Sequence, residues 1–283
     1  KLLGEPRGAY LVSTKQLQDQ IVNDFDLPVL KGRSNYPCLK FNALFPEVTS
    51  EVCSEVKGQD GDCPFESDCP YVVAKRIAIS SPMCVLNYSL FLTEANFVGG
   101  FSNMKFLILD ECDTLEDHLM SFIQVPISRR MMERLILVPP KHKTVLESWK
   151  EWIPGVEGRV TAELDAIGNP ESLPPLRLKD YVRLKRFLKN LQFLEDNLNE
   201  NWVLDLDEKS YSPITFKPVR IAPYASNNLW KHTERSMGMS ATIMGAPAMA
   251  LELGLHTWDV DFTSLPSPFA VENRKVVYWP VAS

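Results

Sequence analysis

Long apolar runs are missing from the sequence. None of the uninterrupted apolar stretches in its 283 residues approaches the roughly 20 residues that a helix needs to span a bilayer. The opening residues, KLLGEPRGAYLVST, also lack the apolar core and the cleavage site of a secretory signal. We therefore expect no membrane partner and a location inside the cell. An apolar content of 45% predicts a substantial core, in one domain with insertions or in two domains.

An excess of positive charge is also missing. Lys and Arg number 30 against 36 Asp and Glu, which gives a formal net charge of −6. The chain as a whole therefore has no attraction for nucleic acid, and any such binding has to come from local patches.

The six cysteines include no closely spaced C-x2-C pair, and in a reducing compartment they are not expected to form disulfides. Cys38, Cys53, Cys63 and Cys69 are separated by 14, 9 and 5 residues and lie among Pro, Asp and Gly. Four thiolates can hold a zinc ion or an iron–sulfur cluster, and the lack of close pairs favours the cluster. Four unrelated buried thiols are the alternative. Cys84 and Cys112, on or beside apolar strands, are expected in the core.

Apolar patterns predict a parallel sheet near the start of the chain. Strands are predicted at 8–14, 83–87 and 105–110, and helices at 15–25 and 69–80, while 31–70 is irregular. Residues 119–205 show no convincing strand pair and several helical patterns, the clearest within 180–198. Strand-like segments return at 214–221 and 236–242, where we expect the interrupted sheet to resume.

The segment FLILDECDTLED, residues 106–117, places carboxylates directly after a buried strand. Ligands in open α/β sheets bind beyond the carboxyl ends of the strands. Asp110, Glu111 and Asp113 are therefore candidates to hold a metal ion and to orient a water molecule. A charged loop after a strand is the alternative.

Six segments together resemble the XPD/DinG group of superfamily 2 DNA helicases in their order and rough spacing. They are GRSNYPC (32–38), DCPYVVAKRIAISSPMCVLNYSLFL (68–92), LILDECDTLED (107–117), FKPVRI (216–221), GMSATIMG (238–245) and SPFAVENR (267–274). The resemblance covers nearly the whole chain and is weakest across the helical region. It implies an α/β fold in which a RecA-like parallel-sheet motor domain (1–30, 71–118 and 206–283) carries an iron–sulfur cluster domain (31–70) and a mostly α-helical arch (119–205).

The resemblance also implies roles for the polar residues. Asp110 would hold the Mg²⁺ of bound ATP, Glu111 would activate the attacking water, and Asp113 would link the nucleotide site to neighbouring motifs. Cys112 and Asp113 replace the Ala-His that is usual in this motif, which leaves Asp113 less firmly assigned. Ser240 and Thr242 would couple the nucleotide state to DNA. Thr14 and Gln20 would lie near the DNA backbone and the nucleotide-side wall, although hydroxyls such as those of Thr14, Ser240 and Thr242 also cap the ends of strands in ordinary folds.

The four cysteines map onto the ligands of a [4Fe–4S] cluster, with the interval from Cys63 to Cys69 closer to DinG than to XPD. Beside them, Arg33 and Tyr36 could contact a phosphate and stack a base of single-stranded DNA. A run of basic residues could contact successive phosphates of the DNA, or it could simply be a solvated helix face. The run consists of Arg177, Lys179, Arg183, Lys185, Arg186 and Lys189.

The sequence contains no G-x-x-x-x-G-K-[ST] phosphate loop. We therefore interpret it as an internal piece of a monomeric, ATP-dependent, 5′–3′ DNA helicase that lacks this loop and the second motor domain, and expect the piece alone to hydrolyse ATP poorly. The resemblance places such an enzyme at the nucleoid in the cytoplasm of a prokaryote or virus-infected cell, or in a eukaryotic nucleus. A non-motor module that binds single-stranded DNA or a partner, and a four-cysteine metal or redox protein, are the alternatives.

Overall fold

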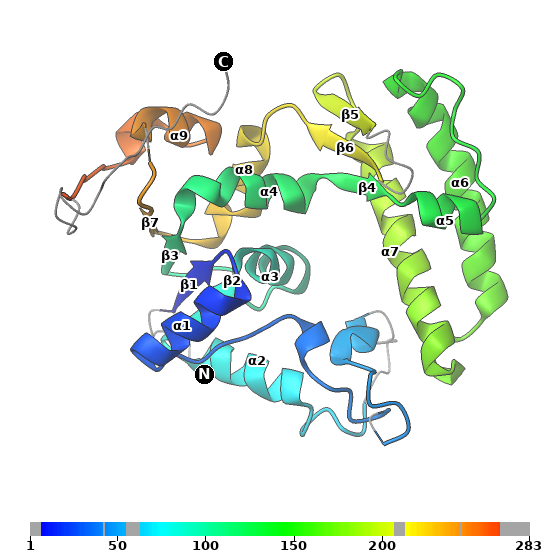
Figure 1. Cartoon of the computed structure of the whole chain (residues 1–283), viewed down its shortest axis with the longest axis horizontal. Helices are drawn as coiled ribbons and strands as arrows, with labels where there is room; N and C mark the ends of the chain where they lie inside the picture. The colour runs from blue at the N-terminus through cyan, green and yellow to red at the C-terminus, as the bar shows by residue number, and fades with distance from the viewer. Residues whose placement is uncertain (1–6, 42, 55–62, 207–212, 244, 267–283) are drawn as a thin grey trace, which may run out of the picture.

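A computed structural model of the chain describes residues 7–41, 43–54, 63–206, 213–243 and 245–266 (Figure 1). The segment SPFAVENR, at 267–274, lies outside the described residues. No helix in the described part of the chain is both long enough and apolar enough to cross a membrane.

Four strands form a parallel sheet in the order β2-β1-β3-β7. Their bounds are Gly8–Val12 (β1), Met83–Asn87 (β2), Phe106–Asp110 (β3) and Ser236–Met239 (β7). The predicted strands at 8–14, 83–87 and 105–110 are thus confirmed, and β3 occupies an inner position as expected. The region at 236–242 does rejoin this sheet, because Leu107 to Asp110 of β3 pair with Ser236 to Met239 of β7.

Helices cover both faces of this sheet, which explains why its strands are apolar on both sides. Four helices flank it: α1 (Lys15–Phe25), α2 (Pro70–Ser80), α3 (Tyr88–Thr93) and α4 (Leu115–Ile123). On one face Tyr10 and Val12 pack with Ile21 of α1. On the other face Leu107 and Leu109 belong to the main core, which also contains buried residues of α2, α3 and α4.

A second, antiparallel sheet has the order β4-β6-β5 and consists of Val125–Ile127 (β4), Trp202–Leu206 (β5) and Ile214–Pro218 (β6). One prediction was therefore wrong: the segment at 214–221 does not rejoin the parallel sheet. The region at 119–205 is mostly helical, but it contributes a strand near each end, and each of these strands pairs with β6. The three-residue β4 contains Pro126, which weakens a strand pattern in sequence. β6 pairs with the preceding strand β5, but its other partner, β4, lies about 90 residues upstream, so the full sheet cannot be inferred from the local sequence.

The remaining helices follow β4 in the sequence. They are α5 (Arg129–Arg134), α6 (Leu146–Ile167), α7 (Pro175–Asn197), α8 (Ala222–Asn228) and α9 (Ala246–Glu252). The two long helices, α6 and α7, form the arm at the right of Figure 1. Trp149 of α6 packs edge-on against Phe216 of β6, with ring centroids 5.3 Å apart, and so fixes the arm to the antiparallel sheet.

In the cysteine-rich segment, residues 31–70, the described residues form two 3-10 turns, Arg33–Asn35 and Ser50–Ser54, and one bridge between Pro37 and Thr49. Its small apolar cluster is completed by Leu178 of α7, which packs with Cys38, Val48 and Val52. An ion pair of 3.1 Å joins Arg186 of α7 to Glu51 in the same contact. Figure 1 shows the result: α4 and β4 lead away from the parallel sheet to the arm, and α7 returns to meet the cysteine-rich segment.

Candidate functional site

Polar residues follow the carboxyl ends of all four parallel strands. Thr14 comes after β1, Asn87 ends β2, Asp110 ends β3, and Ser240 follows β7. Because parallel strands end at the same edge of a sheet, this edge is a candidate site of the kind that α/β proteins use for ligands.

Asp110 is held by two tyrosines at this edge. The Tyr88 hydroxyl donates to the Asp110 carbonyl oxygen at 2.7 Å, and the backbone N–H of Glu111 donates to Asp110 Oδ1 at 3.1 Å. The Tyr10 hydroxyl also bonds to the Asp110 side chain. Burial, with the nearby Asp110 charge and this bond, raises the pKa of Tyr10, which therefore stays neutral as a donor at physiological pH.

Glu111 has an unusual backbone conformation for a residue with a side chain. Its φ is 50° and its ψ is 47°, in the left-handed region that costs a non-glycine residue about 1 kcal/mol or more. The carboxylate is exposed beyond the strand end. Local strain in an exposed acid at a sheet edge is typical of a position selected for function.

Asp113 joins the segment after β3 to the segment after β7. Its Oδ1 accepts a hydrogen bond from Ser240 Oγ at 2.6 Å, and its Oδ2 accepts one from Thr242 Oγ1. These two bonds lower the pKa of Asp113, because both stabilise its charged form. The link is therefore complete at neutral pH and is lost as the pH falls through the lowered pKa.

Cys112 lies between Glu111 and Asp113 in the sequence and packs under β7. It is buried, as is Cys84 in β2, which confirms the prediction that both belong to the core. A Cβ atom on Gly238 would lie 2.8 Å from Cys112 Sγ, closer than a contact allows. Gly238 therefore lets β7 approach the turn that carries Asp110, Glu111 and Asp113.

Gly238→Ala should consequently lower the free energy of unfolding by about 1–3 kcal/mol, as is usual for overpacking. Urea unfolding of the single variants and of Gly238→Ala/Cys112→Ala would measure this. Removing the sulfur should recover part of the loss, so the two changes should be strongly non-additive. Gly158→Ala, at an open position within α6, is the control and should raise stability slightly. Additive losses at 238 and 112 would contradict the packing argument.

Thr14 has a structural task in this fold. Its side chain caps α1 by accepting a hydrogen bond from the backbone N–H of Leu17 at 3.2 Å. Asn87, which the sequence analysis did not select, caps α3 in the same way through Leu90 at 2.8 Å. Thr14 thus has an ordinary capping task, although at the start of a helix and not at the end of a strand. A role for Thr14 or for the exposed Gln20 at DNA stays a prediction.

The four candidate cluster ligands lie in one region of the chain, but only Cys38 and Cys53 are bonded to each other. Cys53 bonds to Cys38, and this bond lowers the pKa of Cys38 to about 6. The same bond, with burial and the charges of Cys38 and Cys63, raises the pKa of Cys53. Cys69 Sγ is 3.8 Å from Ser50 Oγ. Within the described ranges, no three His, Cys, Asp or Glu side chains are close enough to hold a metal ion. The donor set fits a thiolate-ligated centre in its chemistry, whereas its geometry brings no more than pairs together.

Arg33 lies against an aromatic ring that the sequence analysis assigned only to a helix. Its guanidinium carbon is 4.1 Å from the centroid of the Tyr71 ring, which Tyr36 meets edge-on at 5.6 Å. The Tyr71 hydroxyl and the Lys75 ammonium both bond to the buried Glu94. A guanidinium stacked in this way keeps its N–H donors at the edge of the plane, where an anion can reach them.

The basic run of α7 is divided among several ion pairs. Arg183 and Arg134 both approach Asp180, at 3.7 and 3.1 Å, and Arg186 pairs with Glu51. Arg183 thus pairs within its own helix and Arg186 with the cysteine-rich segment, while both side chains stay more than half exposed. Contact with successive phosphates and a solvated helix face both remain predictions for this run.

The fold is similar to that of solved XPD structures. A structure named XPD_Helicase has a TM-score of 0.53 and 14% sequence identity to this chain. The match covers 89% of this chain and 53% of that structure. A structure named Truncated XPD has a TM-score of 0.45 and 14% identity, and the match covers 89% of this chain and 86% of that structure. A third, XPD_APO, has a TM-score of 0.35 and 13% identity, and the match covers 88% of this chain and 53% of that structure. No family model and no curated protein matches the chain.

The chain spans about half the length of the XPD_Helicase structure. At 14% identity the likeness concerns the fold alone. The chain thus has a mixed α/β fold like that of an XPD helicase, with a parallel four-stranded sheet and many helices.

Proposed function

We propose that this chain forms part of an ATP-dependent DNA helicase that translocates on single-stranded DNA in the 5′–3′ direction. The observation that supports this best is the link from Asp113 to Ser240 and Thr242. It connects two polar segments at the carboxyl edge of a RecA-like sheet, where a motor needs nucleotide state and DNA contact to be coupled.

Asp110 and Glu111 have separate tasks in this proposal. Asp110 would hold Mg²⁺ with bound ATP, and the ion would supply neutralisation of the phosphate charge. Glu111, exposed beside it, would accept a proton from the attacking water and orient that water. Tyr10 and Tyr88 position Asp110 through its side chain and its carbonyl.

We also propose that Cys38, Cys53, Cys63 and Cys69 hold a [4Fe–4S] cluster. The support is their common location in a segment with little regular structure and a small apolar cluster, which ligation would stabilise. Zinc is the competing occupant, since four thiolates also satisfy its tetrahedral preference.

Single-stranded DNA would pass beside Arg33 and Tyr36. The stacking of Arg33 on Tyr71 fixes the guanidinium with little further loss of side-chain entropy, which favours its use at a phosphate. Tyr36 is half-buried, and its hydroxyl accepts a bond from the Lys31 N–H at 3.1 Å, so its ring is also held in place.

The proposed coupling can be tested with Asp113→Ala in the protein that carries this chain. The change removes the acceptor of two hydroxyls without disturbing the core, because Asp113 is exposed. We expect basal ATP hydrolysis to persist and its stimulation by single-stranded DNA to fall at least several-fold. Steady-state hydrolysis with and without oligothymidylate is the measurement.

The variants Ser240→Ala and Thr242→Val give the matched comparison. If they act through Asp113, combining either with Asp113→Ala should add nothing further to the loss of stimulation. Asp117→Ala, which removes an exposed acid from the first turn of α4, should leave stimulation unchanged. Normal stimulation of Asp113→Ala would remove the link from the mechanism.

A further inference from the structure

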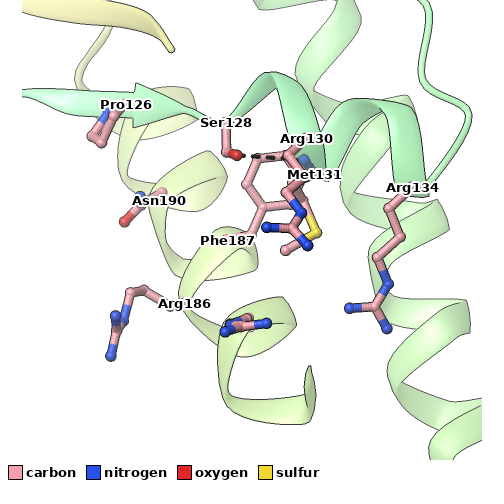
Figure 2. Close-up of a pocket in the computed structure, with 9 residues that line it drawn as sticks. Pro126, Ser128, Arg130, Met131, Arg134, Arg186, Phe187 and Asn190 are labelled. Atoms are coloured by element: carbon pink, nitrogen blue, oxygen red, sulfur yellow. Dashed lines mark hydrogen bonds between the residues drawn. The ribbon is translucent and has the colours of Figure 1, made fainter. Parts of the chain in front are cut away.

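A pocket lies between β4, α5 and α7, away from the carboxyl edge of the parallel sheet. Its volume is about 360 Å³, within the range of small-ligand pockets. Figure 2 shows side chains from the three elements around it. The lining consists of Pro126, Ser128, Arg130, Met131, Arg134, Arg183, Arg186, Phe187 and Asn190.

Four of these nine side chains are arginines and none is acidic. Asp180 contacts Arg134 at 3.1 Å and Arg183 at 3.7 Å, and Glu51 contacts Arg186 at 3.1 Å. These two acids compensate part of the charge from outside the lining. Arg130 makes no recorded ion pair within the part of the chain that the structure describes. The pocket therefore carries a surplus of positive charge.

The remaining lining residues add a floor and further donors. Phe187 is only 5% exposed and packs in the core behind the arginines, so the pocket has a fixed apolar base. Ser128 Oγ accepts the Met131 N–H at 3.4 Å as the cap of α5, which leaves its own proton to donate. Asn190 contributes an amide. Donors thus surround the opening, and a ligand that fits must be rich in acceptors.

The number of guanidinium groups indicates which kind of anion the pocket would bind best. Guanidinium forks match both carboxylate and phosphate oxygens. Four arginines and the two acids beside them, Asp180 and Glu51, leave a surplus of two positive charges, of which a single carboxylate would compensate one. Phosphate groups carry more charge and more acceptor oxygens in a similar volume, particularly when two are joined.

We propose that this pocket binds phosphate groups, through Arg130, Arg134 and Arg183 with Arg186 at its edge. The ligand is either a free diphosphate or consecutive phosphates of a single-stranded nucleic acid. Both sources present the same chemistry to the arginines. The site does not depend on the proposed motor activity, since it lies in the helical insertion and uses none of Asp110, Glu111 or Asp113.

Isothermal titration calorimetry with pyrophosphate tests the site in the full chain. The variant Arg130→Ala/Arg183→Ala removes two exposed guanidinium groups, and we expect its affinity to fall about tenfold or more, because hydrogen bonds to charged groups are the strong ones. The control is Arg159→Ala, which removes an exposed arginine of α6 that lies outside the pocket and donates to the Ile136 carbonyl at 3.5 Å. It should bind pyrophosphate as the unmodified chain does. Unchanged thermal unfolding of the double variant would show that its fold is intact.

A second titration with fluorescent oligothymidylate at several salt concentrations separates the two sources. If the pocket takes a nucleic-acid backbone, the double variant should weaken oligonucleotide binding and reduce the salt slope by about 0.7 for each lost phosphate contact. If it takes a free diphosphate, only pyrophosphate binding should fall. Equal binding of both probes by the double variant and the unmodified chain, or no binding of either probe by the unmodified chain, would overturn the proposal.

Discussion

Replacing Glu111 by Gln is expected to leave ATP and Mg²⁺ binding intact while lowering the rate of ATP hydrolysis by roughly 10²-fold or more. The amide keeps the size of the side chain but cannot accept a proton from the attacking water. Asp110, which would hold the ion, keeps its contacts with Tyr10 and Tyr88. Measuring kcat by steady-state hydrolysis and Kd with a fluorescent ATP analogue separates the two effects.

The same amide substitution at an unrelated acid gives the control for Glu111→Gln. Glu133 is exposed in α5, away from the sheet edge, so Glu133→Gln should hydrolyse ATP at the unmodified rate. Stability should change by less than about 0.5 kcal/mol in either variant, since both positions are exposed. Hydrolysis by Glu111→Gln at the unmodified rate, or loss of nucleotide binding with it, would contradict the assigned role.

Replacing Cys38 by Ser should prevent binding of the proposed iron–sulfur centre and disorganise the contact between the cysteine-rich segment and α7. Cys38 is 3% exposed and packs with Val48, Val52 and Leu178, so the cluster and the apolar contact share this residue. Protein purified without oxygen should be brown with a broad absorbance near ~400 nm, and the variant should be colourless. Iron and sulfide analysis would give the stoichiometry.

An identical change at Cys84 separates loss of a ligand from loss of a buried thiol. Cys84 is 1% exposed in β2, so Cys84→Ser should lower thermal stability yet keep the colour and the iron. Colourless unmodified protein with one zinc per chain would replace the cluster by a zinc site. Equal iron content in Cys38→Ser and in the unmodified protein would exclude Cys38 as a ligand.

Local sequence was sufficient for the parallel sheet. The runs that became β2 and β3 are short, continuous and apolar, and such runs have few alternatives to a strand covered on both faces. It was insufficient for the second sheet. The three residues of β4 give no periodicity, and β6 pairs with this strand across about 90 residues of sequence. Tertiary contacts therefore decide which sheet β6 enters.

The candidate site was likewise predictable from the sequence only in part. That Asp110 and Ser240 would meet at one edge follows from the ends of two predicted parallel strands, and β3 and β7 are indeed neighbours. The stacking of Arg33 on Tyr71 could not be predicted, because Tyr71 reads as an ordinary core residue of an amphipathic helix. The arginine-lined pocket was visible only in part, as a basic run on α7, since Arg130 and Arg134 join it from another helix.

The central claim is that nucleotide hydrolysis and single-stranded DNA binding are coupled through this chain. Steady-state ATP hydrolysis by the protein that carries it, measured with Mg²⁺ in the absence and presence of oligothymidylate, tests that claim most directly. The account predicts slow hydrolysis alone and a several-fold rise with saturating DNA. Tight DNA binding with no ATP hydrolysis under either condition would contradict it and would favour a non-motor DNA-binding module.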